Sequence, residues 1–447
     1  MREGRAAAAG NKAFSKRGIL WTHIALLTLL VTVFGVLAAP PALAEPVRAI
    51  DGLLDLRNAK LDEESAAIHL DGDWDFYWRQ LLRPEDFYYD TPKRRISVSV
   101  PAPWNDAALS GEPLPGFGYG TYRLVVYTPP GAESLALRFS APLTAHRLWV
   151  NGRLLSSAGT VSDRPETAEA RYFNRIIPLR DGNGVLEIVL QVSNYLHHKG
   201  GLRRSIELGD SARLRQEFDT ANAASLAMFG VFVTLGITNL AFFLTRQREK
   251  AALFFALFML LIALRTITVE KTTGTLMALM LEPDLPQVLL LRVEYLSIFS
   301  LTLYAFFVAA MLPELLPRQF LRAVAASSLG LAAMFLFAPV GFFSRQLGIA
   351  NLLFAGALLY MLYRLIRAAW TGGFEPRILL TGHILMLVAI LNDQLFYADL
   401  IQTGNYYYWG FLVVAISHAL LVLHRFTAAF DAVESLNRRL DETNRFK

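Results

Sequence analysis

The hydrophobic and polar positions of the chain follow two patterns, and the change falls near residue 220. Beyond it, hydrophobic segments alternate with short polar loops. Each segment is long enough to form a helix that crosses a hydrocarbon core of roughly 30 Å. We therefore predict seven transmembrane helices, near residues 223–244, 251–269, 288–312, 322–343, 347–366, 378–398 and 408–426. Because this number is odd, the two ends of the chain are expected on opposite sides of the membrane.

The first half of the chain has the shorter period of β-strands. Hydrophobic and polar residues alternate in runs such as 122–127, 135–139 and 185–192, and turn residues separate the runs. Residues 147–150 and 153–155 flank Asn151-Gly152, the pair most typical of a tight β-hairpin turn. Strands at this spacing without helices between them predict a β-sandwich, and about 165 residues suffice for one core.

The N-terminus has the features of an export signal. A basic stretch precedes hydrophobic residues 19–39, and Ala42-Leu43-Ala44 provides small residues before a cleavage site. An uncleaved anchor is the alternative, and both place the following domain outside the cytoplasm. We expect a signal peptide (1–44), an extracytoplasmic sandwich (45–212), a seven-helix domain (220–426) and a cytoplasmic helical linker that begins a coiled coil (427–447).

Composition narrows the classes of function. Charged residues make up 18% of the chain, below the roughly 25% of soluble proteins, and the net charge is +5. No basic cluster is suited to nucleic acid, so we expect no nucleic-acid partner. The chain has no cysteine, which excludes disulfides, thiolate zinc sites and cysteine nucleophiles. Neither a Gly-x-Ser-x-Gly nor a His-Glu-x-x-His motif occurs, so we expect no enzyme activity, metal site or cofactor in this chain.

Basic residues predict the orientation. Cytoplasmic loops are enriched in lysine and arginine. The second, fourth and sixth loops contain only Lys271 and Arg345. The first, third and fifth loops, with the start of the tail, hold Arg246, Arg248, Lys250, Arg318, Arg322, Arg364, Arg367, Arg377 and Arg425. We expect a multi-pass protein of the plasma (inner) membrane with its N-terminal domain outside and its C-terminus in the cytoplasm.

Polar residues inside the spans are costly in lipid and indicate function. Arg265 lies late in the second span, Arg292 and Glu294 lie early in the third, and Asn392-Asp393 lies late in the sixth. All are expected at a similar depth, near the outer surface. We predict a cluster of Arg265, Glu294 and Asp393 that faces the interior of the bundle. The alternative is that each side chain extends separately to the outer headgroups.

Two places in the sandwich are candidates for ligand binding. Trp104 and Asn105 lie in a proline-rich loop, where an aromatic face beside an amide suits a sugar or another polar ring. Packing of Trp104 in the sandwich is the alternative. His197 and His198 are adjacent, so in a strand they would point to opposite faces and would not share a metal ion. We expect their loop to touch the ligand or the membrane domain.

The tail after the seventh span has a heptad pattern. Hydrophobic residues recur at spacings of three and four, as in a coiled-coil seam. They are Phe426, Ala429, Val433, Leu436 and Leu440. We expect a helix continuous with the seventh span that begins a parallel coiled coil in a homodimer. An amphipathic helix on the membrane surface is the alternative.

The order of several stretches resembles bacterial seven-transmembrane receptors with diverse intracellular signalling modules. These stretches are residues 72–78, 101–105, 118–123, 145–152, 191–195, 292–295 and 392–393. The resemblance implies a galactose-binding-like jelly-roll domain that senses a carbohydrate or small molecule, and Tyr119 joins the candidate ligand residues. It also implies a cytoplasmic signalling module, such as a histidine kinase or a nucleotide cyclase, which this chain lacks. Residues 436–447 are similar to the linker before a kinase dimerisation helix.

The sequence therefore predicts a sensory receptor in the lipid bilayer. A transporter or channel with an accessory outer domain is the main alternative. A proton or ion path needs a relay of polar groups across the membrane. Only His383 and His418 are ionisable candidates deep in the bundle, and the two halves of the bundle show no repeat. These observations favour a signalling protein over a transporter.

Overall fold

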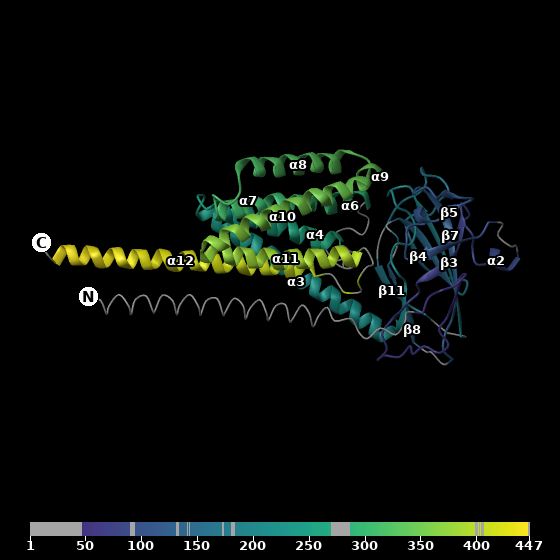
Figure 1. The fold of residues 1–447 in the computed structure, drawn as a ribbon. Helices are drawn as coiled ribbons and strands as arrows, with labels where there is room; N and C mark the ends of the chain where they lie inside the picture. Colours follow the sequence, from purple (N-terminus) through teal and green to yellow (C-terminus); the bar gives the residue numbers. More distant parts are fainter. Residues whose placement is uncertain are drawn as a thin grey trace. The chain divides into compact units, whose positions relative to one another are not determined.

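A computed structural model describes residues 47–445 apart from 90–93, 131–133, 141, 143, 172–173, 180–183, 270–286, 398–400, 402 and 404–405. The predicted signal peptide and Lys271 lie outside the described residues. The chain divides into two compact units, with residues 45–356 in one and residues 357–447 in the other. Figure 1 shows the strands and helices of both.

The first unit begins with a β-sandwich, as predicted. Its larger sheet has the strand order β10-β9-β12-β7-β3-β4, and β1 pairs in parallel with β7. These strands are β1 (Leu53–Asp55), β3 (Gly72–Trp78), β4 (Ile96–Val100), β7 (Gly118–Tyr127), β9 (Ala145–Val150), β10 (Arg153–Ala158) and β12 (Val185–Asn194). Asn151 and Gly152 form the predicted hairpin turn between β9 and β10, with φ of 48° and 76°. Both angles lie in the left-handed region that this turn requires.

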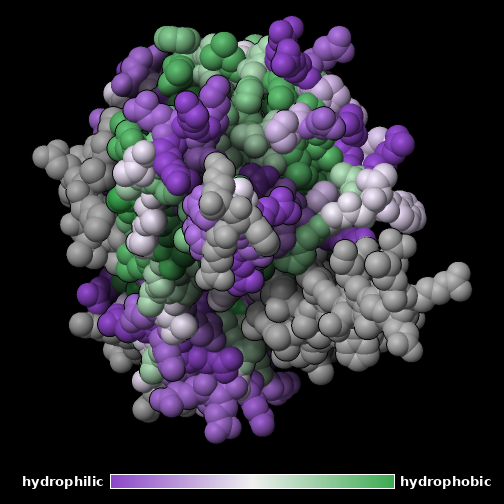
Figure 2. Space-filling model, turned by 90° about the vertical axis from the view of Figure 1, so that its left-hand side faces the viewer, coloured by the Kyte–Doolittle hydropathy of each residue, from purple (hydrophilic) through white to green (hydrophobic). Residues whose placement is uncertain are grey.

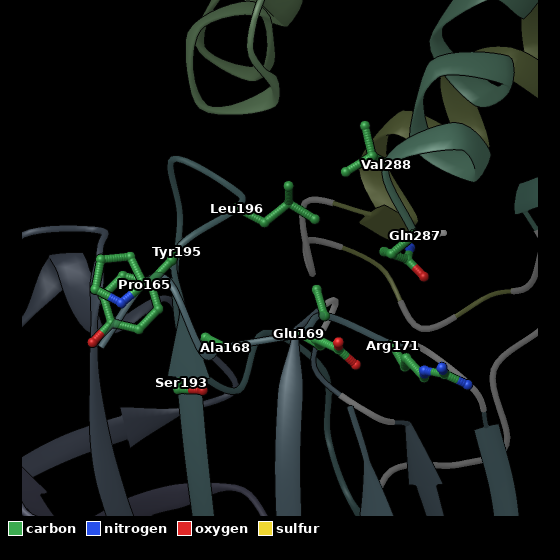
Figure 3. Close-up of a pocket in the computed structure, with 10 residues that line it drawn as sticks. Pro165, Ala168, Glu169, Arg171, Ser193, Tyr195, Leu196, Gln287 and Val288 are labelled. Atoms are coloured by element: carbon green, nitrogen blue, oxygen red, sulfur yellow. The ribbon is translucent and has the colours of Figure 1, made fainter. Parts of the chain in front are cut away.

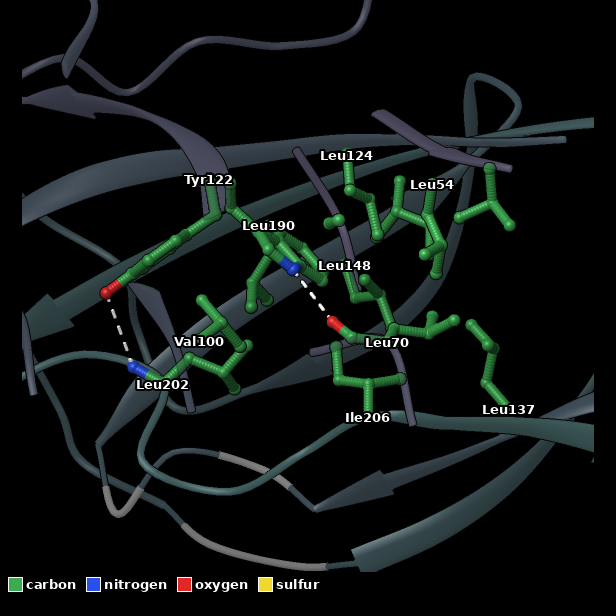
Figure 4. Close-up of a cluster of buried hydrophobic side chains, with 14 of the residues drawn as sticks. Leu54, Leu70, Val100, Tyr122, Leu124, Leu137, Leu148, Leu190, Leu202 and Ile206 are labelled. Carbon is green, nitrogen blue, oxygen red and sulfur yellow. Dashed lines mark hydrogen bonds between the residues drawn. The ribbon is translucent and has the colours of Figure 1, made fainter. Parts of the chain in front are cut away.

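The smaller sheet closes the other side of the core. It has the order β11-β8-β13-β2. Its strands are β2 (Ile68–His69), β8 (Leu135–Ser140), β11 (Asn174–Pro178) and β13 (Glu207–Asp210), and a separate hairpin joins β5 (Ala108–Leu109) to β6 (Glu112–Pro113). Figure 4 shows leucines from both sheets in one buried cluster. The polar groups of Trp74 and Tyr122 in this cluster are hydrogen-bonded. Trp74 Nε1 donates to the Leu70 carbonyl (2.9 Å), and the Tyr122 hydroxyl accepts from Leu202 N (3.3 Å).

The first long helix, α3 (Ser211–Thr245), starts directly after β13. Its 35 residues give a length of about 52 Å, more than a bilayer core needs. Asp210 caps its N-terminus by accepting a hydrogen bond from Arg213 N (2.9 Å). Glu217 pairs with Arg138 of β8 (2.6 Å), and Leu214 is fully buried. The span predicted to start at 223 is therefore the second part of a helix whose polar first turns pack on the sandwich.

Five further elements complete the helical part of the first unit before α10. They are α4 (Lys250–Val269), α6 (Gln287–Leu296), α7 (Ser300–Met311), α8 (Arg318–Phe337) and α9 (Val340–Phe343). A short 3-10 segment, η2 (Ser297–Phe299), joins α6 to α7, and another, η3 (Ser344–Gln346), joins α9 to α10 (Leu347–Thr371). The fourth span ends at Phe337, six residues earlier than predicted for it, because Pro339 has no amide hydrogen to continue the helix.

The second unit contains most of α10 with α11 (Phe374–Tyr397) and α12 (Tyr407–Arg445). Arg425 of α12 pairs with Glu375 of α11 (2.8 Å). α12 continues without a break from the seventh span into the tail. Continuity of the tail helix is as predicted, whereas the coiled coil remains a prediction.

Seven helices are long and apolar enough to cross a membrane, which confirms the predicted number among the described residues. Many of their large apolar side chains are exposed, and Phe337 and Trp370 are each 84% exposed. Figure 2 shows such hydrophobic residues in green on the surface of the molecule. Lipid is the environment that makes this exposure favourable, so the chain is a multi-pass membrane protein.

Candidate functional site

Residues 194–201, which start at the last residue of β12, form a folded loop that we call the docking loop. Asn194 fixes its shape from within. The Asn194 amide nitrogen donates to the carbonyls of Gly116 and His197, both at 2.7 Å, and its amide oxygen accepts from His197 N (3.0 Å). Asn194 is fully buried. The loop therefore has a defined conformation rather than a free one.

Trp104 and Asn105, predicted as ligand residues, support the docking loop from behind. Asn105 donates to the His198 carbonyl (3.2 Å) and accepts from Gly200 N (3.0 Å). The Trp104 side chain is 1% exposed, and its Nε1 donates to the Pro115 carbonyl (2.9 Å). A Cβ at Gly200 would lie 2.4 Å from the Trp104 ring, so glycine is required there. In this structure both residues contact the protein's own backbone.

The docking loop touches the helical part of the same unit. His198 Nδ1 lies 2.9 Å from the Ser344 hydroxyl in η3. Leu196 packs against the buried cluster of Leu291, Phe335, Val340, Phe343 and Ala350. A Cβ at Gly341 would lie 2.6 Å from the Phe117 ring, which shows how closely this part of the sandwich approaches α9. Sandwich and helices are thus joined by a polar contact beside an apolar one.

Burial shifts the pKa of both histidines in the loop. It lowers the pKa of His198 to about 4, and the nearby charges of Lys199, Arg203 and Arg345 act in the same direction. It lowers the pKa of His197 to about 3, with the Arg203 charge as a further cause. Both rings are therefore neutral at pH 7. The contact with Ser344 is a hydrogen bond between two neutral groups.

Tyr119, the fifth predicted ligand residue, lies in β7 opposite Ser193 of β12. Its carbonyl accepts from Arg79 N (2.9 Å). Its phenol is close enough to that of Tyr195 for the two to interact electrostatically. The structure therefore places Tyr119 beside the start of the docking loop.

Two of the predicted intramembrane residues are linked through Ser297 of η2. Arg265 of α4 donates to the Ser297 hydroxyl (2.9 Å), and this hydroxyl donates to the Glu294 carbonyl (2.5 Å). The Arg265 charge also acts on the Glu294 carboxyl group. The structure thus brings Arg265 and Glu294 into one polar network at the break between α6 and α7.

Arg292 has a separate role at the end of α8. Its guanidinium group donates to the carbonyls of Phe335 (2.5 Å), Leu336 and Ala338 (3.0 Å), and it lies over the Phe343 ring. The last carbonyls of a helix have no partner within it and carry the negative end of its dipole. A cation from α6 therefore satisfies the C-terminus of α8 and ties these two helices together.

Asn392 and Asp393 belong to the second unit. The Asp393 carboxylate accepts from Tyr406 N (2.7 Å) and Tyr407 N (3.0 Å) at the start of α12, where an anion is favoured. Asn392 accepts from the Thr403 hydroxyl (2.8 Å). Because Asp393 lies in one unit and Arg265 and Glu294 in the other, the predicted cluster of all three stays a prediction.

A cavity of about 430 Å³ lies in the first unit between the sandwich and the start of α6. Figure 3 shows Ser193, Tyr195 and Leu196 at the end of β12, and Gln287 and Val288 from α6. The remaining lining residues are Pro165, Ala168, Glu169, Ala170 and Arg171. None of Trp104, Asn105, Tyr119, His197 and His198 lines this cavity. The sequence offered one indirect signal for it, since Ser193 and Tyr195 lie in a stretch that carries the family resemblance.

The chain thus consists of an N-terminal β-sandwich followed by a membrane domain of seven helices. Residues 221–425 match the family described as 7TM diverse intracellular signalling. This match covers the membrane domain and agrees with the family resemblance of the sequence. No curated protein matched the sequence.

Solved structures that match part of the chain include glycosidases. Ruminococcus gnavus β-glucuronidase is 15% identical over 34% of this chain and 30% of its own, with a TM-score of 0.27. The same enzyme in complex with D-glucuronic acid is 15% identical over 33% of this chain and 31% of its own, with a TM-score of 0.26. The chain therefore spans less than a third of the length of these enzymes.

Proposed function

We propose that this protein is a transmembrane signalling receptor. The extracytoplasmic sandwich binds a carbohydrate or another small molecule, and the seven helices relay binding to a cytoplasmic output module of the histidine kinase or cyclase type. The match of the membrane domain to the signalling family supports this proposal. In this proposal the catalytic step of signalling belongs to the output module.

The observation that carries the proposal is the contact of the docking loop with α9 and η3. Leu196 touches this part of the bundle through apolar packing, and His198 touches it through the hydrogen bond to Ser344. A second connection runs through Asp210, where β13 passes directly into α3. With two rigid connections, a change in the sandwich acts on two different helices of the first unit.

The bundle has irregular segments at which a change in the sandwich would act. A 3-10 stretch between helices often marks a hinge. The docking loop contacts η3 at Ser344, while Arg265 and Glu294 meet at η2 through Ser297. For binding to produce a signal, the ligand must favour one of two states of the bundle. We propose that these two 3-10 segments change between the states.

We further propose that the sandwich and docking loop face the outside of the inner membrane and that the tail of α12 is cytoplasmic. The distribution of basic residues supports this orientation. The seam residues Val433, Leu436 and Leu440 are more than half exposed in the single chain. Pairing of two tails in a homodimer covers these side chains and carries the change to the output module.

The experiment fuses a histidine kinase output domain to the C-terminus and measures autophosphorylation in membranes. Leu196→Asp places a charge in the apolar contact, so we expect autophosphorylation to change at least severalfold without loss of folded protein. Leu154→Asp is the matched control, because Leu154 is exposed in the sandwich hairpin. If both variants signal like the wild type, the docking loop does not couple the sandwich to the bundle.

The orientation is tested separately by cysteine labelling. The chain has no cysteine of its own, so one introduced thiol is unique. A membrane-impermeant maleimide added to intact cells should label Arg153→Cys, at an exposed position of the sandwich hairpin, and leave Arg439→Cys in the tail unlabelled. The reverse pattern would invert the proposed topology.

A further inference from the structure

We propose that the cavity between the sandwich and α6 binds a small zwitterion, of the class of free amino acids and short peptides. The inference rests on the proposed receptor function and names the site and chemistry of its ligand. The cavity, of about 430 Å³, is in the lower part of the range of roughly 300–1,000 Å³ found for small-molecule sites.

The wall of the cavity is preformed. Thr160 and Glu169 exchange backbone hydrogen bonds (2.9 and 3.2 Å), which closes the loop between β10 and β11. Ser162 N donates to the Ser193 hydroxyl (3.3 Å), and the Tyr195 hydroxyl donates to the Asp163 carbonyl (2.7 Å). The loop is thus tied to the end of β12 without any ligand. A rigid site loses little entropy when it binds.

The lining carries both signs of charge on one short segment. Glu169 and Arg171 both line the cavity and are exposed. A guanidinium group binds a carboxylate through paired hydrogen bonds, and a carboxylate accepts from an ammonium group. A molecule with a carboxylate and an ammonium group matches this arrangement.

Polar and apolar groups complete the recognition surface. Gln287 is 6% exposed and lines the cavity, so its amide is held in place beside it. Tyr195, Leu196 and Val288 offer aromatic and aliphatic surface for a ligand side chain. A neutral sugar carries no charge that complements Glu169 or Arg171. An ion of one sign would meet a like charge.

The position of the cavity explains how ligand binding would act on the helices. Leu196 and Val288 both line the cavity and both pack against the buried cluster below the docking loop. A ligand in the cavity therefore contacts the sandwich and α6 at once. α6 also carries Arg292, which holds the end of α8. Occupancy of the cavity favours one relative position of the sandwich and α6.

The experiment measures the thermal unfolding of the full chain in nanodiscs with three sets of probes. The first set contains the standard amino acids and their glycine dipeptides. The second contains the same compounds with the amino group acetylated or the carboxylate amidated, and the third contains neutral mono- and disaccharides. We expect at least one zwitterion to raise the unfolding temperature, and its acetylated and amidated forms to have no effect.

Variants of two residues that line the cavity test whether the zwitterion binds there. Glu169→Gln and Arg171→Gln should each weaken the binding of that zwitterion by about ten- to hundredfold, as expected for a lost charged hydrogen bond. The matched controls are Glu166→Gln and Arg164→Gln, which change exposed residues of the same loop that do not line the cavity. Their affinity should equal that of the wild type.

The inference is overturned if no zwitterion stabilises the wild type, or if Glu169→Gln and Arg171→Gln bind it as well as the controls do. Stabilisation by sugars alone would overturn the zwitterion and leave the receptor function intact. Loss of the kinase response in Leu196→Asp relative to Leu154→Asp tests the receptor function without any ligand, so the two failures are distinguishable.

Discussion

His198 and Ser344 are hydrogen-bonded across the contact between the sandwich and the helices, with His198 Nδ1 at 2.9 Å from the Ser344 hydroxyl oxygen. The two residues are 146 positions apart in the sequence. The His198 carbonyl accepts from Asn105, so the backbone of this histidine is held by the sandwich. This pair makes the contact between the two parts of the unit sensitive to protonation.

Acidification should weaken the folded state through His198. The pKa of His198 is lowered from its ordinary value of 6.5 to about 4, mainly by burial. An unfolded histidine takes up a proton below pH 6.5, whereas the folded one does not until about pH 4. Stability is therefore present above pH 6.5 and falls as the pH drops toward 4. The unfolding temperature of the full chain should be lower at pH 5 than at pH 7.

His198→Asn should reduce this pH dependence without abolishing it, because burial also lowers the pKa of His197 and His146 to about 3. His69→Asn, a change in the exposed end of β2, is the control. An equal drop between pH 7 and 5 in the wild type and in His198→Asn would contradict the assignment to His198.

Asn105→Ala should loosen the docking loop. The change leaves the His198 carbonyl and Gly200 N without their partner, at a cost of about 1–3 kcal/mol in the free energy of unfolding. Hydrogen exchange at Gly200 should become faster. The neighbouring Asp106→Ala, at an exposed position, should leave both quantities unchanged. Equal exchange in the two variants would show that Asn105 does not brace the loop.

Arg292→Met should destabilise the bundle, because it removes the donor for three carbonyl groups at the end of α8. We expect a loss of about 2–3 kcal/mol, the value for a hydrogen bond that involves a charged group. Arg322→Met, a matched change at an exposed position of α8, is the control. Thermal unfolding in detergent measures both, and equal stability would exclude the clamp between α6 and α8.

Cysteines introduced on one face of the tail should form disulfides between two copies of the chain in membranes. Leu436→Cys and Leu440→Cys lie on the heptad seam and should crosslink two copies under mild oxidation. Arg438→Cys and Arg439→Cys lie off the seam and should crosslink weakly. Non-reducing electrophoresis measures the dimer fraction. Equal crosslinking at all four positions would argue against a coiled coil.

Asp393→Ala should weaken the start of α12. The Asp393 carboxylate accepts from Tyr406 N and Tyr407 N, and loss of such a cap costs about 0.5–2 kcal/mol. Asp393→Asn keeps an acceptor and should lose less. Thermal unfolding of the two variants should therefore rank them in this order, and the opposite order would show that the cap is not the role of Asp393.

Hydropathy along the chain was enough to predict the order of the elements. Each transmembrane span is identified by its own composition, and the hairpin at Asn151-Gly152 by two adjacent residues. These signals are local, so they do not depend on which segments meet. The polar first turns of α3 escaped the prediction, because residues 211–222 have no hydrophobic run and are stabilised by Leu214 packing on the sandwich and by the pair of Glu217 with Arg138.

The sequence by itself determined that this protein has a strand-rich domain, seven spans and a charged helical tail. Only the tertiary structure decided what its candidate residues touch. Asn105 meets His198 across 93 positions, and Arg292 meets the end of α8 more than 40 positions away. The cavity joins residues of the loop between β10 and β11, of the end of β12 and of the start of α6, which share no pattern. Periodicity records the face that each residue buries, whereas chain topology decides which buried faces meet.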